Sequence, residues 1–224
     1  MALIDVLMPY RASDRHRMRV FLGMREAWDA VDFPVNVIVG ADNGDGPFNL
    51  SRAANTAYAR STADIVLLHG VDHIPPTPDK LAWVVERLAH ERWVPLYCGT
   101  RLLGKGMTEK VLADVARGHL PLNPQVYGTT ARYPNCTGVM AFRREAWDQL
   151  GWMDERFYGW GCEDTALRLA AESVFGLPSL PYGDLTTLWH PRAPRDRFSA
   201  NSGILGEYIA AHHAGRMADY LESR

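Results

Sequence analysis

The sequence is poor in cysteine and contains no long apolar run. Its three cysteines, Cys98, Cys136 and Cys162, lie far apart and form no CxxC pair, so we expect neither a zinc knuckle nor a disulfide framework. The N-terminal apolar run is short, interrupted by Asp5 and followed by Pro9, which is typical of neither a signal peptide nor a membrane span. We therefore expect a cytoplasmic protein, free or peripherally associated.

Positive charge is not in excess either. The sequence has 24 Lys and Arg residues and 26 Asp and Glu residues, which give a net charge of -2. This balance argues against a nucleic-acid-binding surface over the whole protein, although it leaves room for a local basic patch. The sequence also lacks the GxxxxGK[ST] phosphate loop, a GxGxxG after the first strand and the GxSxG elbow. The sequence therefore lacks the motifs that usually indicate a kinase, a dehydrogenase or a serine hydrolase.

The order of apolar runs and amphipathic segments predicts an α/β fold. With 224 residues, 47% of them apolar, and no linker or repeat, we expect a single domain, 1–224. Strands are predicted over residues 3–8, 35–40, 64–70, 94–99, 137–142 and 184–190. Helices are predicted after Ser13, over 50–61, after Thr77, over 143–150, from Glu163 onward and over 204–222. The βαβαβα order of the first half predicts a parallel sheet with helices on both faces.

Polar and charged side chains follow several of the predicted strands. These strand exits carry Tyr10 and Arg11, Asp42, Asp72 and His73, and His190. Because ligands of open α/β sheets bind at the carboxyl ends of the strands, we expect these side chains to form one binding site. The stability of the fold does not by itself explain why polar or charged side chains follow so many of the strands.

The segment LLHGVDHIPP offers a candidate metal ligand. Asp72 and His73 directly follow an apolar strand, where a carboxylate is well placed to hold a divalent cation against phosphate oxygens. The same pattern is also typical of a solvated turn before two prolines, in which Asp72 caps the local backbone. Spacing leaves both interpretations open, because an isolated Asp-His pair is a weak signal.

The segment TLWHPRAPRDRFSANSG places three arginines after His190. They are Arg192, Arg195 and Arg197, and guanidinium groups match phosphate oxygens through bidentate hydrogen bonds. The segment is therefore a candidate loop that closes over a diphosphate. The alternative is an ordinary basic surface loop with a structural histidine.

The segment FYGWGCEDTALRLAAE combines glycines, aromatic rings and two carboxylates at the start of a helix. Gly159 and Gly161 permit a close approach of the backbone to a ligand, and Trp160 between them offers a flat face for a sugar ring. Glu163 and Asp164 can divide labour, because one can accept a hydrogen bond from a substrate hydroxyl while the other takes its proton. A capped helix with a core tryptophan is the alternative, and it explains less of the pattern.

Together these segments resemble the GT-A class of nucleotide-sugar glycosyltransferases over residues 3–200. VLMPYR and GWGCED are similar to the opening Pro-aromatic-Arg turn and the Trp-Gly-Gly-Glu-Asp segment of the β-1,4-galactosyltransferase family. ADNGDG and FNLSRAAN resemble the base-binding loop of family 2 enzymes and the helix after it, TGVMAFRREAW resembles the Gly-Gly-Val strand, and GVDHIP occupies the place of the Asp-x-Asp metal motif. Gly70 replaces the first aspartate of that motif, Leu50 replaces an arginine for which Arg52 substitutes, and Cys162 replaces a glycine.

The resemblance implies a GT-A fold, a Rossmann-like three-layer α/β sandwich with a mostly parallel central sheet. Residues 1–100 would form the nucleotide-binding half, and residues 101–224 the acceptor-binding half with the C-terminal helix. The implied function is metal-dependent transfer of a hexose from a nucleoside diphosphate donor, expected to be a UDP-sugar, to a hydroxyl acceptor with inversion. The alternative is a non-catalytic sugar- or nucleotide-binding module of the same fold, which the lost aspartate at Gly70 favours.

The resemblance also implies roles for individual residues. Asp164 would be the general base, Glu163 would position the acceptor, and Mn²⁺ or Mg²⁺ would be held by Asp72 and His190, with His73 as the alternative ligand. The residues expected at the acceptor are Tyr158, Trp160 and Gly161. The residues expected at the nucleotide donor are Pro9, Tyr10, Arg11, Asp42, Arg52, Asp72, Arg192 and Arg197. The acceptor class stays open because variable loops such as 100–135 build its pocket, and the C-terminal helix either packs on the core or pairs with a second subunit.

Overall fold

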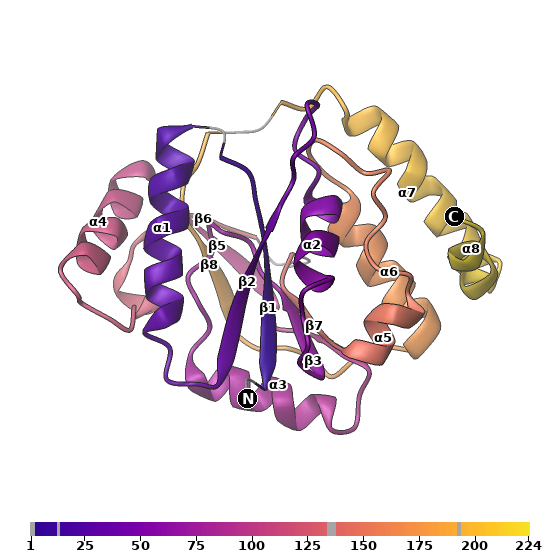
Figure 1. The fold of residues 1–224 in the computed structure, drawn as a ribbon, viewed down its shortest axis with the longest axis horizontal. Coiled ribbons are helices and arrows are strands. Elements are labelled where there is room, and N and C mark those ends of the chain that lie inside the picture. The colour runs from indigo at the N-terminus through magenta and orange to yellow at the C-terminus, as the bar shows by residue number, and fades with distance from the viewer. Residues whose placement is uncertain (1–2, 13, 134–137, 192–193) are drawn as a thin grey trace.

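The computed structural model describes residues 3–12, 14–133, 138–191 and 194–224. The strands are β1 (Ile4–Tyr10), β2 (Val35–Ala41), β3 (Ile65–Leu68), β4 (Trp93–Pro95), β5 (Gly99–Leu103), β6 (Thr129–Tyr133), β7 (Met140–Arg143) and β8 (Asp184–Thr187). The helices are α1 (Arg15–Asp29), α2 (Leu50–Tyr58), α3 (Pro78–Leu88), α4 (Lys105–Ala116), the 3-10 turn η1 (Pro124–Val126), α5 (Arg144–Gln149), α6 (Glu163–Phe175), α7 (Phe198–His213) and α8 (Met217–Ser223). Figure 1 shows the strands in the middle of the molecule, between two groups of helices.

The central sheet has the strand order β2-β1-β3-β7-β4. β1 pairs in parallel with β2 and β3, whereas β7 runs antiparallel to its neighbours β3 and β4. Four of the five strands therefore point in the same direction, so the predicted mostly parallel sheet is confirmed. The carboxyl ends of β1, β2 and β3 lie at one edge of the sheet, which is the upper edge in Figure 1.

The core has two parts, one on each face of the central sheet. Leu7 and Leu68 point to the face where α2, α5, α6 and α7 pack, together with the buried Tyr208 of α7. Val6 and Leu67 point to the opposite face and pack with residues of α1 and α3. Because side chains alternate along a strand, each strand of the sheet serves both layers. The expected three-layer arrangement is thus present.

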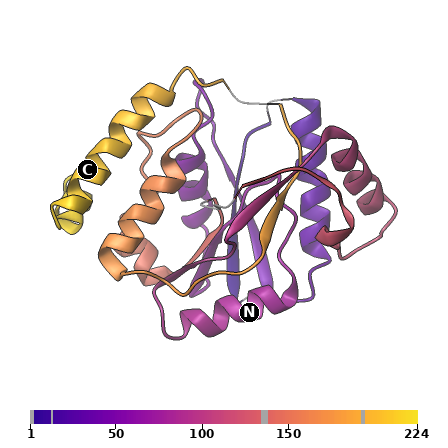
Figure 2. The ribbon, with the colours of Figure 1, turned by 180° about the vertical axis from the view of Figure 1, so that it is seen from behind.

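A second, smaller sheet with the order β6-β5-β8 was not predicted from the sequence (Figure 2). The prediction of one strand over 94–99 is wrong. The chain leaves the central sheet after Pro95, at the end of β4, and enters the second sheet as β5 at Gly99. The region 100–135, expected to consist of variable loops, holds α4, η1 and β6. Leu103 of β5 and Val111 of α4 pack with α1, so this region is part of the folded core.

The helix termini agree with the predictions in some places and differ in others. Thr77 caps α3, since its side chain accepts a hydrogen bond from the Lys80 backbone N–H, as its position before Pro78 predicted. Ser13, expected to cap α1, lies outside the described residues, and the Asp14 carboxylate accepts the capping hydrogen bond. The single C-terminal helix expected over 204–222 is wrong: α7 and α8 are separated at Gly215, which has a φ of 63° that favours glycine.

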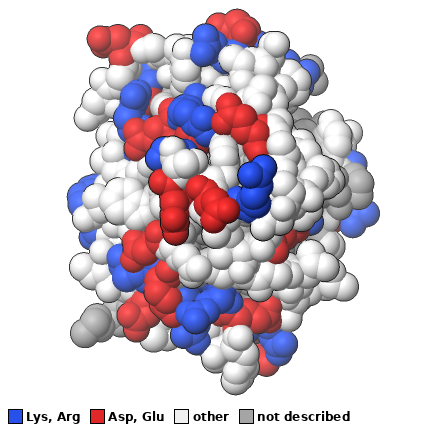
Figure 3. Space-filling view, turned by 90° about the vertical axis from the view of Figure 1, so that its right-hand side faces the viewer, with Lys and Arg blue, Asp and Glu red and all other residues white. Residues whose placement is uncertain are grey.

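The surface over α6, α7 and α8 carries interspersed acidic and basic side chains (Figure 3). The ion pair between Arg156 and Glu207, with 2.8 Å between Nη1 and Oε2, is one example. α7 packs on α6 through Tyr208 and Ala211, which is the packing alternative for the C-terminal helix. In the part of the chain that the structure describes, every helix is too short or too polar to span a bilayer.

Candidate functional site

Side chains from distant parts of the sequence meet at the carboxyl edge of the central sheet. Asp72 follows β3 and His190 follows β8, and His190 Nε2 lies 3.0 Å from Asp72 Oδ2. The backbone holds them there, because the Leu188 N–H donates to the Asp72 carbonyl at 2.7 Å and His73 forms a β-bridge with Thr187. The structure therefore brings together the two predicted metal ligands.

Charge around Asp72 favours its ionised form. Burial alone raises the pKa of the Asp72 carboxyl, but His73, the hydrogen bond from His190 and the charge of Arg17 outweigh burial, so the pKa lies below its usual value. The hydrogen bond with Asp72 raises the pKa of His190 in turn. His73 Nε2 lies 3.6 Å from Asp72 Oδ1. His73 is therefore also close enough to Asp72 to serve as the alternative ligand.

The donor set around Asp72 fits a divalent cation that is shared with a substrate. One carboxylate and one imidazole face each other, and His190 Nδ1 lies 2.8 Å from the Pro191 carbonyl, the kind of second contact that orients a metal-binding imidazole. Among the described residues, no group of three or more His, Cys, Asp or Glu side chains forms a complete cation cage. Phosphate oxygens and water commonly complete such two-ligand sites for Mg²⁺ and similar ions.

Arg17 is a site residue that the sequence patterns missed. Its Nη2 lies 3.0 Å from His190 Nδ1, and its charge also acts on the pKa values of Asp72 and Tyr10. Arg17 is in the first turn of α1, where its backbone N–H is capped by Asp14. The basic run RHR (15–17) at the start of the helix predicted after Ser13 was the available signal.

Gly70 makes room for the Asp72 and His73 side chains. A Cβ at Gly70 would lie 2.8 Å from His73 Cε1 and 3.0 Å from Asp72 Oδ1, and contacts of that length force a neighbour to move. The glycine that replaces the first aspartate of the Asp-x-Asp motif thus lets Asp72 and His73 lie close to the backbone of this turn.

Restoring an aspartate at this position is therefore expected to weaken cation binding. Gly70→Asp should displace His73 and Asp72 and raise the Kd for Mn²⁺ by about 10-fold, a loss typical of disturbed ligand orientation. Titration of Mn²⁺ followed by electron paramagnetic resonance measures this change. Gly128→Asp is the matched control, because a Cβ at Gly128 meets nothing within 4 Å. Tighter Mn²⁺ binding by Gly70→Asp would contradict this role of the glycine.

Asp42 lies at the centre of a closed network in the loop after β2. Its carboxylate is buried and accepts hydrogen bonds from Arg11, from Arg52 Nε at 2.7 Å and from the Asn49 backbone N–H at 2.8 Å. Burial raises the pKa of Asp42, but these donors outweigh it and hold the pKa at about 2. Arg11 and Arg52 therefore both contact Asp42. That these three residues bind a nucleotide stays a prediction.

Tyr10 ends β1 beside this network and presents an aromatic face. Its ring stacks on Phe21 of α1 with 4.0 Å between the ring centroids, and its hydroxyl has no hydrogen-bond partner among the described residues. Pro9 lies in β1 itself and is buried. Tyr10 is thus held in place by packing, and its hydroxyl is buried.

The predicted acceptor loop and the predicted arginine loop lie against each other. The Arg195 guanidinium is 4.3 Å from the centroid of the Trp160 ring, and the Arg197 guanidinium is 4.1 Å from that of Tyr158. Asn201 Nδ2 donates to the Gly161 carbonyl at 2.9 Å and fixes this arrangement. Arg192 lies outside the described residues. Trp160 remains 40% exposed.

The backbone before α6 adopts a left-handed conformation at three positions, which are Gly159 (φ 74°), Gly161 (φ 102°) and Cys162 (φ 79°). These φ values turn the chain sharply into the helix, and two of the three residues are glycines, as the sequence indicated. Cys162 makes no side-chain capping bond. The turn places half-buried Asp164 in the first turn of α6, where its Oδ1 accepts from the Thr165 backbone N–H at 2.7 Å.

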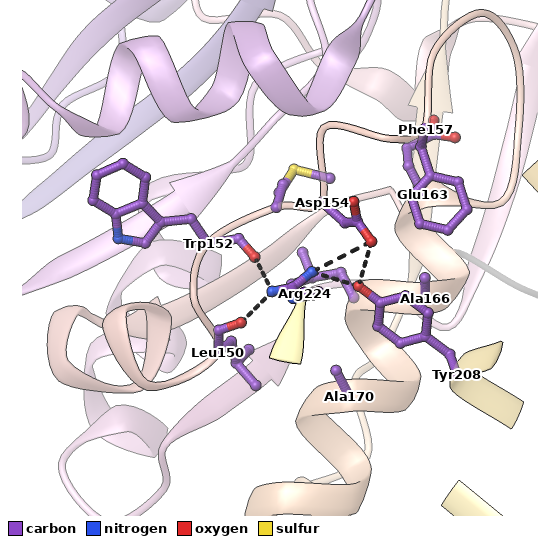
Figure 4. A pocket seen from close by; sticks show the side chains of 11 residues that line it. Leu150, Trp152, Asp154, Phe157, Glu163, Ala166, Ala170, Tyr208 and Arg224 are labelled. Atoms are coloured by element: carbon purple, nitrogen blue, oxygen red, sulfur yellow. Dashed lines mark hydrogen bonds and ion pairs between the residues drawn. The ribbon is translucent and has the colours of Figure 1, made fainter. Parts of the chain in front are cut away.

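Glu163 lines a small pocket beside the start of α6 (Figure 4). Its neighbours there include Phe157 and Ala166, and its Oε2 has no hydrogen-bond partner among the described residues. The Arg224 guanidinium fills the other end of the pocket, where it donates to the Trp152 carbonyl at 3.0 Å. Burial, and secondly the neighbouring Asp164 carboxylate, raise the pKa of Glu163 to about 7.

Comparisons with known proteins agree with this architecture. A family model described as the N-terminal domain of galactosyltransferase matches residues 118–174, whereas no curated protein matches the sequence. Glucosyl-3-phosphoglycerate synthase from Mycobacterium tuberculosis, in complex with phosphoglyceric acid, is 18% identical, with 94% of this chain and 80% of that chain covered and a TM-score of 0.52. The chain has the GT-A glycosyltransferase fold.

A second solved structure is similar over a shorter part of its length. The catalytic domain of Drosophila β1,4-galactosyltransferase 7, in complex with xylobiose, is 19% identical, with 75% of this chain covered and a TM-score of 0.41. This chain spans 59% of that structure.

The raised pKa of Glu163 in this GT-A chain makes stability depend on pH. The folded protein holds the Glu163 proton up to about pH 7, whereas the unfolded chain releases it near pH 4.5. Between these values the folded state binds more protons, so the contribution of Glu163 to the free energy of unfolding falls as the pH rises. Glu163→Gln removes this pH-dependent contribution, so the variant should gain stability relative to the native protein by on the order of 3 kcal/mol between pH 4.5 and pH 7. Urea unfolding at pH 5 and pH 8 measures the gain, and an unchanged difference at the two pH values would contradict it.

Proposed function

We propose that the protein is a metal-dependent glycosyltransferase that moves a hexose from a UDP-sugar to a hydroxyl acceptor with inversion. The observation that carries this proposal is the 3.0 Å contact between Asp72 Oδ2 and His190 Nε2 at the carboxyl edge of the GT-A sheet. Ligands of such sheets bind at this edge. Support also comes from the Mycobacterium tuberculosis synthase, whose structure of the same fold is a complex with Mn²⁺ and UDP-glucose.

Asp72 and His190 would hold Mn²⁺ or Mg²⁺, with His73 as the alternative ligand, and the imidazole favours Mn²⁺. When bound, the cation supplies Lewis-acid stabilisation of the negative charge that builds on the leaving diphosphate. Arg17 adds a fixed positive charge next to His190, from the first turn of α1. A diphosphate at this edge would therefore meet positive charge from α1 as well as from the cation.

The acceptor would be activated at the start of α6. During transfer, the hydroxyl oxygen forms a bond to the anomeric carbon while the bond from that carbon to the diphosphate oxygen breaks, and the electron pair of the broken bond leaves with the diphosphate. Asp164 takes the hydroxyl proton as the general base. Glu163 positions the acceptor, and the exposed face of Trp160 stacks on a sugar ring, beside Tyr158 and Gly161.

The donor would lie along the first three strand exits, in the nucleotide-binding half, 1–100. Pro9 and Tyr10 would contact the nucleoside, and the network of Arg11, Asp42 and Arg52 would shape its pocket. Arg197 would exchange its contact with the Tyr158 ring for a diphosphate oxygen, because a charge-assisted hydrogen bond is stronger than a cation–π contact at a partly exposed site. The acceptor would bind the second half, 101–224.

Turnover of nucleotide sugars tests this proposal directly. The protein is incubated with UDP-glucose, UDP-galactose or UDP-N-acetylglucosamine and Mn²⁺, and the release of UDP is followed with and without a chelator. The proposed function requires chelator-sensitive UDP release with at least one donor. UDP release that persists in the chelator argues against the metal dependence.

A non-catalytic module that binds a sugar or a nucleotide is the second candidate. Two observations favour it: Gly70 stands where the motif has an aspartate, and Arg195 and Arg197 occupy the aromatic faces of the acceptor loop. In the same assay, this candidate requires tight UDP-sugar binding, measured by calorimetry, without UDP release from any donor.

A further inference from the structure

The segment that joins α6 to β8 exposes two leucines that the proposed reaction does not use. Leu177 is 86% exposed and Leu180 is 91% exposed, the highest values among the large apolar side chains of the described residues. Together with Pro178, Ser179 and Pro181 they form the sequence Leu-Pro-Ser-Leu-Pro, here called the 177–181 ridge. In Figure 2 the segment crosses the front of the molecule close to α3, away from the upper edge where β1 and β2 end.

The proline rules restrict the backbone of the ridge to an extended form. Pro178 and Pro181 have a fixed φ, and a residue before proline, such as Leu177 or Leu180, is driven toward the polyproline II region. The described segment belongs to no helix or strand, which suits polyproline II, a helix with three residues per turn and no internal hydrogen bonds. The two leucines then share one edge, the two prolines share the next, and Ser179 lies on the third.

The third edge is attached to the protein. The Ser179 backbone N–H and hydroxyl donate to Glu91 Oε2 and Oε1 at 2.7 and 2.6 Å. Lys80 Nζ, which is buried, donates to the Tyr182 carbonyl at 2.7 Å and lies over the Tyr182 ring. Trp93 Nε1 donates to the Gly176 carbonyl at 3.2 Å at the other end. The ridge is therefore held in place by contacts before, within and after it, with its two leucines turned outward and Pro178 and Pro181 half-buried beside them.

We propose that the 177–181 ridge is a docking ligand for a partner protein that has an aromatic-lined groove for polyproline II segments. Such grooves recognise PxxP segments, and they gain affinity because the ligand helix is formed before binding. The two exposed leucines are three residues apart, which matches successive pockets of one groove, whereas a bilayer has no requirement for this spacing. The ridge lies away from the Asp72–His190 pair, so a docked partner would leave the donor edge open.

A panel of purified SH3, WW and EVH1 domains, which carry such grooves, provides the probe. Binding of the full chain to each domain is measured by calorimetry. We expect at least one domain to bind, and Leu177→Ser/Leu180→Ser to weaken that binding by about 10-fold or more, as for residues at the centre of an interface. Leu22→Ser is the matched control, since Leu22 is an exposed leucine of α1 at 57%, and it should bind as the native protein does.

Three results would overturn this proposal. They are no binding to any domain of the panel, binding that the double substitution leaves unchanged, and leucine-dependent association with phosphatidylcholine vesicles or with a second copy of the chain in place of the domains. Thermal unfolding of the double variant should match that of the native protein, because both leucines are exposed. The assay of UDP release is independent, so its failure would leave the docking result intact.

Discussion

Asp164→Asn is expected to lower the rate of sugar transfer by about 10²–10⁴-fold, the usual contribution of a general base. The amide keeps the size of the side chain and can still accept the hydrogen bond from the Thr165 backbone N–H, but it cannot take a proton from the acceptor hydroxyl. Binding of UDP should stay unchanged, because the donor is expected at the strand exits. Steady-state transfer with a responsive donor, combined with calorimetry of UDP, measures both quantities.

Glu172→Gln is the matched control for Asp164→Asn. Glu172 is a carboxylate of the same helix, paired with Arg168 four residues earlier, and its substitution should keep the transfer rate within about 2-fold, as for a surface ion pair. Full turnover by Asp164→Asn would refute the assignment of the base. A parallel loss of UDP binding would place Asp164 with the donor instead.

Asp72→Asn is expected to weaken Mn²⁺-dependent binding of UDP by about 100-fold or more. The substitution keeps the shape of the side chain but removes the one carboxylate that faces His190 across 3.0 Å. Divalent cations of this kind prefer charged oxygen ligands, so the shared site between the protein and the diphosphate should fail. Calorimetry of UDP with and without Mn²⁺ measures the loss without any need for turnover.

Asp79→Asn is the matched control for Asp72→Asn. Asp79 is an exposed carboxylate in the first turn of α3, and its substitution should leave Mn²⁺-dependent UDP binding unchanged. Equal affinity of Asp72→Asn for UDP in the presence of Mn²⁺ would rule out Asp72 as a cation ligand. It would also remove the main support for the proposed function.

Sequence patterns identified the first half of the fold because each element there is a local unit. β1, β2 and β3 are short apolar runs, and α3 begins at a Thr-Pro signal, so neighbouring residues report the element directly. The second sheet was missed for the opposite reason. β6 is largely exposed and reads Thr-Thr-Ala-Arg-Tyr, without apolar alternation, and pairing with β5 stabilises it.

The candidate site was partly predictable. The polar residues after predicted strands included Asp72 and His190, but β3 and β8 belong to different sheets, and the bridge between His73 and Thr187 joins their ends. Contacts that depend on side-chain direction were not visible in the sequence. Arg11 and Arg52 turn onto the buried carboxylate of Asp42, and Arg197 turns onto the aromatic face of Tyr158.

The sequence by itself determined the order of strands and helices in the first half, the glycine-rich turn into α6 and the polar residues at the strand exits. These features follow from backbone preferences and hydrophobic periodicity, which act over a few neighbouring residues. Only the tertiary structure decided that Arg17 meets His190 and that Arg224 enters the pocket lined by Glu163. Such contacts join residues far apart in the chain, and their geometry depends on how all the layers pack together.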